Sequence, residues 1–215
     1  ELTVNRWIIG ELVDTLAQLD KAFDELRFDD MANAIYHFTW GTFCDWYVEL
    51  VKGGFEEEPR RVAAWAFDQI LVMLHPFMPF VTEELWNANE RPYELIVAKW
   101  PAPEAQSDPR AKAEIEWLIR LISAVGTTRT ELNVPPSAKL EAYVESSSES
   151  LWQRIERHSE AIRRIARIDQ MVQPNFAANI ESVGTLQGLA LAKLWSAQVV
   201  VGGDTFIIPL QDVID

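Results

Sequence analysis

The sequence predicts a mainly α-helical fold, in which a helical bundle is followed by a small mixed α/β module. Three observations support this prediction. Apolar residues recur at helical spacing through most of the first 134 residues, the double proline Pro135-Pro136 interrupts this pattern, and strand-like alternation with a glycine turn follows it. We therefore expect residues 1–134 to form the bundle and residues 135–215 to form the module.

The first expected helix runs from about Val4 to Leu26. Its apolar residues recur at steps of three and four with charged residues between them, which is typical of an amphipathic bundle helix. They are Ile8, Leu12, Leu16, Leu19, Phe23 and Leu26.

A central helix is expected from Met31 to Lys52, where large apolar side chains occupy more than one face. A helix that is apolar nearly all round must be covered on several sides, so we expect it in the core, with the rings of Tyr36 and Trp40 widening its apolar surface. Asp29 or Asp30 can cap its start, and Gly53-Gly54 ends it.

Two shorter helices should follow. Glu56-Glu57-Glu58 before Pro59 is typical of a helix N-terminus, and this helix should reach about Leu74. The prolines of the stretch 75–79 must then break or kink it, and we expect His75 to be a helix cap or a hydrogen-bonded core histidine. Thr82 is the expected cap of the next helix, and 95–97 should be an extended connector.

A long helix should begin at the cap Asp108 and end at the stretch 133–136, NVPP. Beyond it, apolar and polar residues alternate from Lys139 to Glu145, which predicts a strand. A helix or helix pair is expected from about Ser150 to Arg167. Near the end, two β-branched runs flank Gly202-Gly203-Asp204, which predicts a β-hairpin.

Composition limits the possible functions. The net charge is −14, which argues against nucleic-acid binding through the overall charge, so any such binding must use a local cationic patch. The single cysteine excludes an internal disulfide and a multi-thiolate zinc site. We find no membrane span or signal peptide and expect a cytoplasmic protein without a bound metal. The chain opens without Met, so we expect it to be part of a longer protein.

The stretch Phe43-Cys44-Asp45-Trp46-Tyr47 allows a catalytic interpretation, because a thiol, an acid and His37 lie within a few positions. On a helix, however, His37 and Cys44 would be separated by roughly 10 Å along the axis, too far for a nucleophile and its base. We therefore expect Cys44 to be a packed core residue and no residue of this chain to be catalytic. Asp45, among so many aromatic rings, should need an arginine or a helix N-terminus as its partner.

Three motifs in this order resemble the class I aminoacyl-tRNA synthetases, and in particular their valyl enzymes. They are FCDWY at 43–47, HPFMPFVTEELW at 75–86 and NVPP at 133–136. We take the residues that carry the resemblance as structural; besides 43–47 they are His75, Pro76, Pro79, Glu83, Glu84, Trp86, Asn133, Pro135 and Pro136.

The resemblance implies an anticodon-binding bundle followed by a module leading toward a C-terminal arm. The whole enzyme would attach valine to its tRNA with ATP and Mg²⁺, and we expect it to be a monomer. This chain lacks the HIGH and KMSKS signatures of the catalytic core, so it should hold no cofactor and be inactive alone. The family's first bundle helix also has no counterpart here.

Candidate tRNA-binding residues are cationic or aromatic, because unpaired RNA is held by phosphate contacts and by stacking. Trp7 has a core alternative. Arg129 could face phosphate or pair with Asp45, and the five arginines from 154 to 167 could instead form a solvated face with intervening acids. The candidates are Arg6, Trp7, Arg120, Arg129, Arg154, Arg157, Arg163, Arg164 and Arg167.

One alternative function belongs to a different class, a helical scaffold that binds another protein, and the acidic balance favours it. A closer alternative is the equivalent domain of an isoleucyl or leucyl enzyme.

Overall fold

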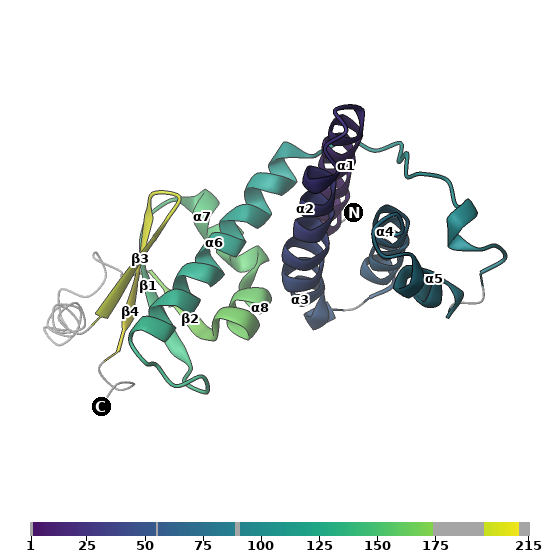
Figure 1. Ribbon diagram of the computed structural model, residues 1–215. Helices are drawn as coiled ribbons and strands as arrows, with labels where there is room; N and C mark the ends of the chain where they lie inside the picture. The colour runs from purple at the N-terminus through teal and green to yellow at the C-terminus, as the bar shows by residue number, and fades with distance from the viewer. Residues whose placement is uncertain (1, 55, 89–90, 174–195, 211–215) are drawn as a thin grey trace, which may run out of the picture. The chain divides into compact units, whose positions relative to one another are not determined.

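The computed structural model describes residues 2–54, 56–88, 91–173 and 196–210 (Figure 1). By its internal packing the chain divides into two compact units, residues 1–115 and 116–215. This division falls inside the long helix, so that its first residues belong to the first unit and the rest to the second. The domain boundary that we placed at residue 134 remains a prediction. Within the described residues, no helix combines the length and the apolar character that crossing a membrane requires.

The first unit is helical, as predicted. Its elements are α1 (Thr3–Asp24), α2 (Phe28–Tyr36), η1 (His37–Tyr47), α3 (Val48–Val51), η2 (Lys52–Gly54), α4 (Glu57–Leu74), α5 (Pro79–Asn87) and η3 (Leu95–Val97). The long helix α6 (Pro109–Glu131) begins in this unit, where Asp108 Oδ1 accepts hydrogen bonds from the backbone N–H groups of Arg110 and Ala111, as its expected capping role requires.

Helix α1 buries the apolar face that its spacing predicts. Ile8, Leu12, Leu16 and Leu19 are buried, but Phe23 and Leu26, which we placed on the same face, are exposed. Leu26 lies beyond the end of the helix and has a φ of 57°, so it leaves the helical period.

The central helix is continuous from α2 to η2, but its middle segment, η1, is a π-helix. Hydrogen bonding from residue i to i+5 spreads the side chains of such a segment over a wider period. Phe38, Phe43 and Tyr47 are buried, which confirms the core prediction for one side of the helix. The prediction of an apolar surface nearly all round was wrong, because Tyr36 and Trp40 are exposed.

The ends of the central helix fit the sequence only in part. Gly54 closes it, as predicted. The predicted cap at its start was wrong, because Arg27 occupies the N-cap position and Asp29 and Asp30 lie in the first turn of α2. Acids there still favour the helix, since they face its positive end.

The motif at 75–86 forms the junction between the end of α4 and helix α5 in the first unit. Thr82 was expected to cap α5 but lies within it, 1% exposed, and its hydroxyl donates to the Met78 carbonyl at 2.8 Å. His75 occupies the C-cap position of α4, which confirms the first of its two alternatives, and its Nδ1 lies 2.9 Å from the Thr82 hydroxyl. The side chain is half-buried rather than in the core. Pro79 takes the first position of α5.

Glu83 and Trp86 of the same motif form hydrogen bonds to the segment that follows α5. Glu83 accepts a hydrogen bond from the Leu95 N–H at 2.9 Å, while Glu84 is exposed. Trp86 is buried and donates from Nε1 to the Tyr93 carbonyl at 2.9 Å. The segment Leu95–Val97 is a short 3₁₀ helix rather than the extended connector that we expected.

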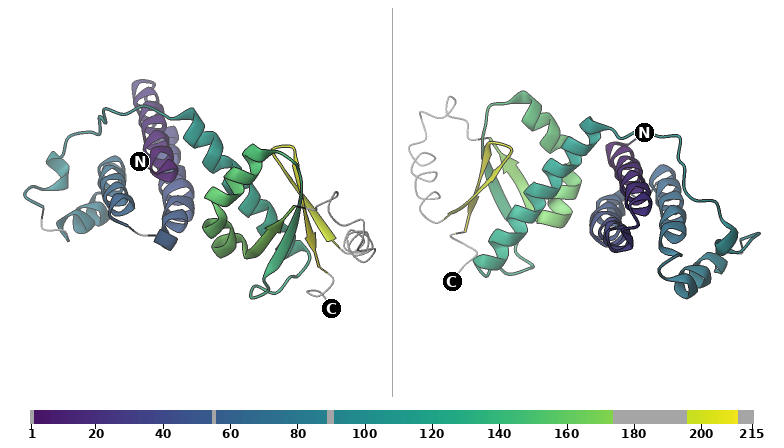
Figure 2. Two further views of the ribbon diagram at one scale, coloured as in Figure 1. Left: turned by 180° about the vertical axis from the view of Figure 1, so that it is seen from behind. Right: turned by 45° about the horizontal axis from the view of Figure 1, so that its top comes forward.

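The second unit combines the rest of α6 with a four-stranded sheet of order β2-β1-β4-β3. Its further elements are β1 (Leu140–Glu145), α7 (Glu149–Arg157), α8 (Ser159–Ala161), η4 (Ile162–Ala166), β2 (Ile168–Val172), β3 (Ser196–Val201) and β4 (Asp204–Pro209). Helices α6, α7 and α8 lie on one side of the sheet (Figures 1 and 2). The mixed α/β character of the module is therefore as predicted.

The sheet of this unit combines a hairpin of adjacent strands with a pairing between strands that are far apart in the sequence. The hairpin of β3 and β4 turns at Gly202 and Gly203, whose φ values of 63° and 91° suit its two-residue turn. Strand β2, which pairs in parallel with β1, was not predicted. The parts of our predicted module at 174–195 and 211–215 lie outside the described residues.

Candidate nucleic-acid interface

The five arginines from 154 to 167 divide into two groups. Arg157, Arg163 and Arg167 are exposed, whereas Arg154 and Arg164 are half-buried. The guanidinium carbon of Arg154 lies 5.1 Å from the centre of the Trp117 ring, which is a cation–π distance. Arg154 therefore helps to pack α7 onto α6, and the three exposed arginines are the better candidates for phosphate contacts.

Arg129 has a structural role that we did not predict. Its Nη2 donates to the carbonyl oxygens of Pro135 at 2.9 Å and Ala138 at 2.7 Å. Burial, and then the nearby charge of Arg167, lower the pKa of Arg129. Asp45 is exposed, so the buried acid that we proposed as a partner of Arg129 does not exist.

The NVPP motif is a helix stop that Arg129 reinforces. Asn133 has a φ of 53°, and the Val134 N–H donates to the Arg129 carbonyl at 2.9 Å, which is a Schellman-type end to α6. Pro135 and Pro136 follow and cannot continue the helix. The predicted end of the long helix is therefore confirmed, with asparagine in the left-handed position that a helix end favours.

The remaining candidates from the sequence are engaged within the protein. Arg6 Nε lies 3.2 Å from Asp108 Oδ2, and Arg120 lies 3.9 Å from Glu116 on the same helix. Trp7 is 4% exposed, which agrees with its core alternative rather than with base stacking. The partners of Arg6 and Arg120 are partly exposed surface acids, so each pairing is weak and either arginine can exchange its acid for a phosphate.

The FCDWY stretch is divided between core and surface. Phe43 and Tyr47 are buried, with ring centres 5.6 Å apart. Cys44 and Asp45 are exposed, so the expectation of a packed core cysteine was wrong. Partial burial of the thiol, and then the Asp45 charge, raise the pKa of Cys44, which is the opposite of what an activated nucleophile needs.

A polar groove of about 520 Å³ runs along α1, α2 and η1, and our sequence analysis missed it. Its lining offers amides, an imidazole and charges, from Gln18, Lys21, Glu25, Arg27, Asn33 and His37. Gln18, Lys21, Glu25 and Asn33 lie in stretches that we had treated only as bundle helices. Arg27 lies between those two helices, and we had considered His37 only as a base for Cys44. The signal available in the sequence was a run of polar residues at spacings of three and four, which share a helix face.

Two exposed rings lie next to this groove. Tyr36 and Trp40 are 57% and 58% exposed, and their ring centres are 6.1 Å apart with planes 13° apart. The Tyr36 ring also meets the His37 ring edge to face, with centres 5.6 Å apart. We call Tyr36 and Trp40 the aromatic platform. It is continuous with the groove through His37.

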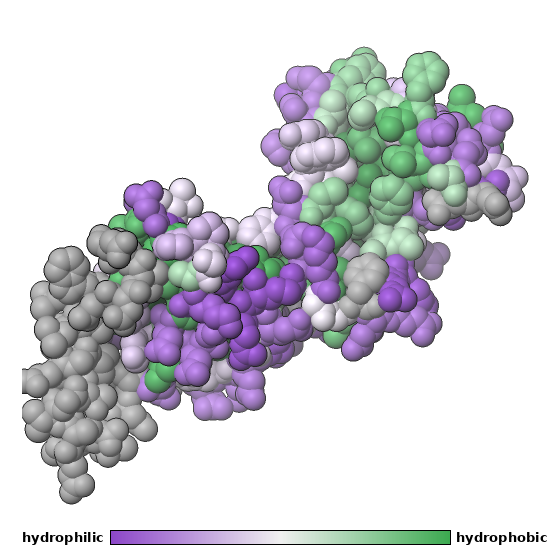
Figure 3. Space-filling view, turned by 90° about the horizontal axis from the view of Figure 1, so that it is seen from below, coloured by the Kyte–Doolittle hydropathy of each residue, from purple (hydrophilic) through white to green (hydrophobic). Residues whose placement is uncertain are grey.

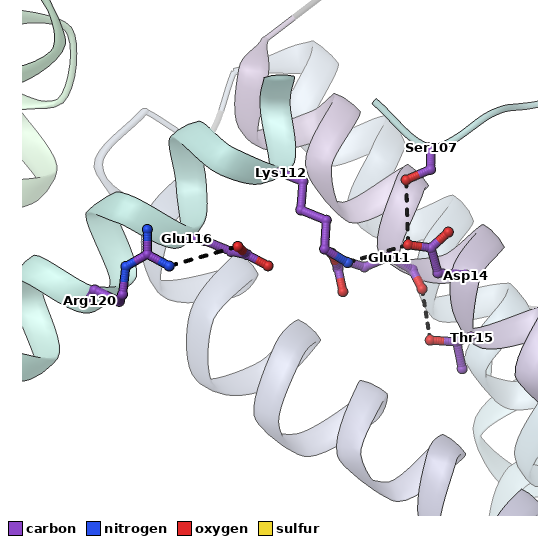
Figure 4. Close-up of polar contacts among 7 residues, drawn as sticks. All are labelled: Glu11, Asp14, Thr15, Ser107, Lys112, Glu116 and Arg120. Carbon is purple, nitrogen blue, oxygen red and sulfur yellow. Dashed lines mark hydrogen bonds and ion pairs between the residues drawn. The ribbon is translucent and has the colours of Figure 1, made fainter. Parts of the chain in front are cut away.

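Several charges at the groove are balanced by neighbours. Lys112 Nζ lies 2.8 Å from Glu11 and 3.3 Å from Asp14, and these contacts attach the start of α6 to α1 (Figure 4). The hydrogen bond with Glu11 is the main cause of the raised pKa of Lys112. Arg27 lies 2.6 Å from Asp30. Glu11, Arg27 and Asp30 on the lining are therefore in ion pairs, and the lining also carries Lys21, Glu25, the amides and the imidazole.

The first unit also has an apolar groove of about 710 Å³. Its lining includes Leu19, Phe23, Phe28, Met31, Phe77 and Trp100. Figure 3, a view from below, shows apolar side chains gathered over part of the first unit. Such an apolar surface is more typical of a contact with protein than of a contact with phosphate.

Comparison with known proteins identifies the family. The family model described as the anticodon-binding domain of tRNA ligase matches residues 5–144. The whole chain is 49% identical to part of a valine–tRNA ligase of Rhizorhabdus wittichii, covering 23% of that protein. It is 41% identical to part of the valine–tRNA ligase of Sphingopyxis alaskensis and 42% identical to part of that of Zymomonas mobilis, covering 25% and 24% of them. The chain thus spans about a quarter of these relatives and belongs to the family of anticodon-binding domains of tRNA ligases.

Proposed function

We propose that this chain is the part of a valine–tRNA ligase that binds the anticodon arm of valine tRNA and positions the tRNA. The observation that carries the proposal is the match of the anticodon-binding family model to residues 5–144, together with identity to valine–tRNA ligases along the whole chain. The names of these relatives favour valine over the isoleucine and leucine alternatives.

Positioning is the mechanistic role that suits a domain without catalytic groups. Phosphate contacts fix the register of the RNA, and base contacts distinguish one anticodon from another. A tRNA that is held out of register presents its acceptor end badly to a distant active site, and such misplacement lowers the reaction rate. Discrimination between tRNAs by this domain therefore changes the reaction rate at the distant active site.

The chemistry of the whole enzyme would lie outside this chain. The ligase would use ATP with Mg²⁺ to activate valine, and it would act in the cytoplasm as a monomer. Among the described residues no three His, Cys, Asp or Glu side chains come together as metal ligands. The chain also carries no glycine-rich phosphate loop, so its residues do not fit ATP and Mg²⁺, and we assign no step of that chemistry to it.

The test is a titration of this chain with three RNAs at low and moderate salt. They are valine tRNA, the same tRNA with an altered anticodon, and an unrelated tRNA. Binding that weakens when only the anticodon changes would place base recognition within this chain. Equal and steeply salt-dependent binding to all three would leave only phosphate contacts here. Absence of binding at low salt would contradict the proposal for the isolated chain.

A second candidate function is a scaffold that binds a protein. The apolar groove favours it, because aromatic side chains such as Phe23 and Phe28 are about half exposed there. The two functions use different surfaces. Phe28→Ser changes the apolar groove and should leave tRNA affinity unchanged if RNA binds elsewhere on the first unit. If no tRNA binds the unchanged protein, the scaffold is the surviving candidate.

A further inference from the structure

The aromatic platform is an unusual surface for a helix whose other side forms the core. Tyr36 and Trp40 expose more than half of their surface although each could contribute substantial apolar area to packing. Their rings are stacked with planes 13° apart, and more than half of each side chain stays exposed, so a further flat ring can extend the stack. Flat exposed rings of this kind are what proteins use to stack unpaired bases.

The local helix geometry fixes the orientation of these rings. Residues four apart on a helix lie on one face, and α2 changes to the π-helix η1 directly after Tyr36. The buried positions Phe38 and Phe43 hold the other side of the same segment in the core. The platform is therefore attached to a rigid, packed element rather than to a loop, and π segments often occur at functional sites.

The adjoining groove supplies groups that can recognise the edge of a base. The amides of Gln18 and Asn33 and the imidazole of His37 can each donate and accept hydrogen bonds. The acid Glu25 disfavours a phosphate in the groove, while Lys21 and Arg27 lie on its lining, where they can contact a backbone at its rim. The chemistry thus suits base edges inside the groove and phosphates outside it.

We propose that the aromatic platform stacks an unpaired RNA base and that the polar groove takes the edge of a neighbouring base. The ligand class is single-stranded RNA, which in the proposed function is the anticodon loop, and the inference rests on that function for the identity of the ligand. The site lies wholly within the first unit and within the residues that the family model matches.

The experiment measures binding of a short RNA hairpin that carries the anticodon loop of valine tRNA, with the whole tRNA measured in parallel. The variants are Trp40→Ala and Tyr36→Ala, with Trp40→Phe and Tyr36→Phe as conservative partners that keep a ring. Stacking of one base supports a loss of about 5- to 150-fold in affinity for each alanine variant. The phenylalanine variants should recover most of this loss.

Two controls separate stacking from other effects. Phe80→Ala removes a ring that is 90% exposed elsewhere in the first unit, and it should bind the hairpin as the unchanged protein does. A hairpin whose loop lacks its bases should bind the unchanged protein and Trp40→Ala equally, because only phosphate contacts remain.

Photocrosslinking from a bromouridine in the loop to the unchanged protein should label Tyr36 or Trp40, and this readout needs no variant to fold.

The outcomes distinguish this inference from the proposed function. If the hairpin and the tRNA bind but the alanine variants match the unchanged protein and the crosslink lies elsewhere, the platform is refuted and the proposed function stands. If neither RNA binds the unchanged protein at low salt, both are refuted for this chain.

Discussion

The phenol of Tyr47 donates a hydrogen bond to Asn5 Oδ1 at 2.8 Å, and it joins the central helix to α1. Asn5 is fully buried, and its Nδ2 donates in turn to Glu58 Oε1 at 2.8 Å. One asparagine thus connects three helices of the first unit, since Glu58 lies on α4. Buried polar groups of this kind specify one arrangement because each is costly to leave unpaired.

Removing one hydroxyl from this network should measure its contribution. Tyr47→Phe leaves Asn5 Oδ1 buried without its donor, so we expect the free energy of unfolding to fall by about 1–3 kcal/mol. The measurement is urea unfolding at neutral pH. Tyr36→Phe makes the same chemical change on an exposed ring and should stay within about 0.5 kcal/mol of the unchanged protein. Equal losses in both variants would contradict a specific role for the buried network.

The carboxylate of Glu58 should make stability depend on pH. The backbone N–H of Leu2, and then the Asn5 amide, lower the pKa of Glu58 below its ordinary value of 4.5. Because the folded pKa is the lower one, the stabilisation is present above about pH 4.5 and is lost as the pH falls through the folded pKa.

Glu58→Gln tests this dependence, because glutamine does not titrate. The unchanged protein should be more stable than the variant at neutral pH, and the difference should shrink toward zero in acid. Thermal unfolding of both proteins, from neutral pH down to below pH 4.5, measures this difference in stability. A difference that stays constant with pH would show that the charge of Glu58 is not what the two N–H donors stabilise.

The Nη2 donor of Arg129 should be needed at the end of α6. Arg129→Met removes the donor that serves both the Pro135 and the Ala138 carbonyls, so we expect a loss of roughly 1–3 kcal/mol in the free energy of unfolding. Arg120→Met, at a surface pair, should change it by less than about 0.5 kcal/mol. If the two variants are equally stable, the carbonyl contacts of Arg129 contribute nothing measurable.

Local patterns in the sequence were enough to predict most of the fold. The spacing in α1, the Asp108 cap, the Asn133 helix end and the glycine hairpin each depend on interactions within a few residues. Strand β2 was missed because its partner β1 lies more than twenty residues earlier and supplies the pairing that makes it a strand. The Thr82 cap was misplaced because α5 begins one turn earlier, at Pro79, which suits the first helical position.

The candidate site was harder to predict than the fold. Composition identifies Arg129 and Arg154 as cations, but only the folded chain shows that carbonyls and the Trp117 ring engage them. The aromatic platform was assigned to the core because α-helical spacing places Tyr36 and Trp40 close to buried neighbours. The helix changes to a π-helix at His37, and no local pattern in the sequence indicates this change.

The turn of the β3–β4 hairpin gives a clear backbone test. Gly203 has a φ of 91°, so Gly203→Ala should lower the free energy of unfolding by about 1–2 kcal/mol. Gly126→Ala, in α6 where an added Cβ meets nothing within 4 Å, should instead raise it by about 0.5–1 kcal/mol. Urea unfolding of both variants checks the opposite signs, and a stabilising Gly203→Ala would contradict the turn geometry.

The exposed arginines of the second unit should govern the salt dependence of RNA binding rather than its sequence preference. Arg163 and Arg167 are exposed, near the end of the helical layer. If each contacts a phosphate, changing it to glutamine should reduce the slope of log K against log salt by roughly 0.7–0.9. Valine tRNA and an unrelated tRNA should lose affinity together, because phosphates carry no sequence information. Lys139→Gln removes the same charge from a residue that lies 3.2 Å from Asp169, so it controls for net charge. An equal slope change in this control would mean that overall charge, and not a phosphate contact at Arg163 or Arg167, causes the effect.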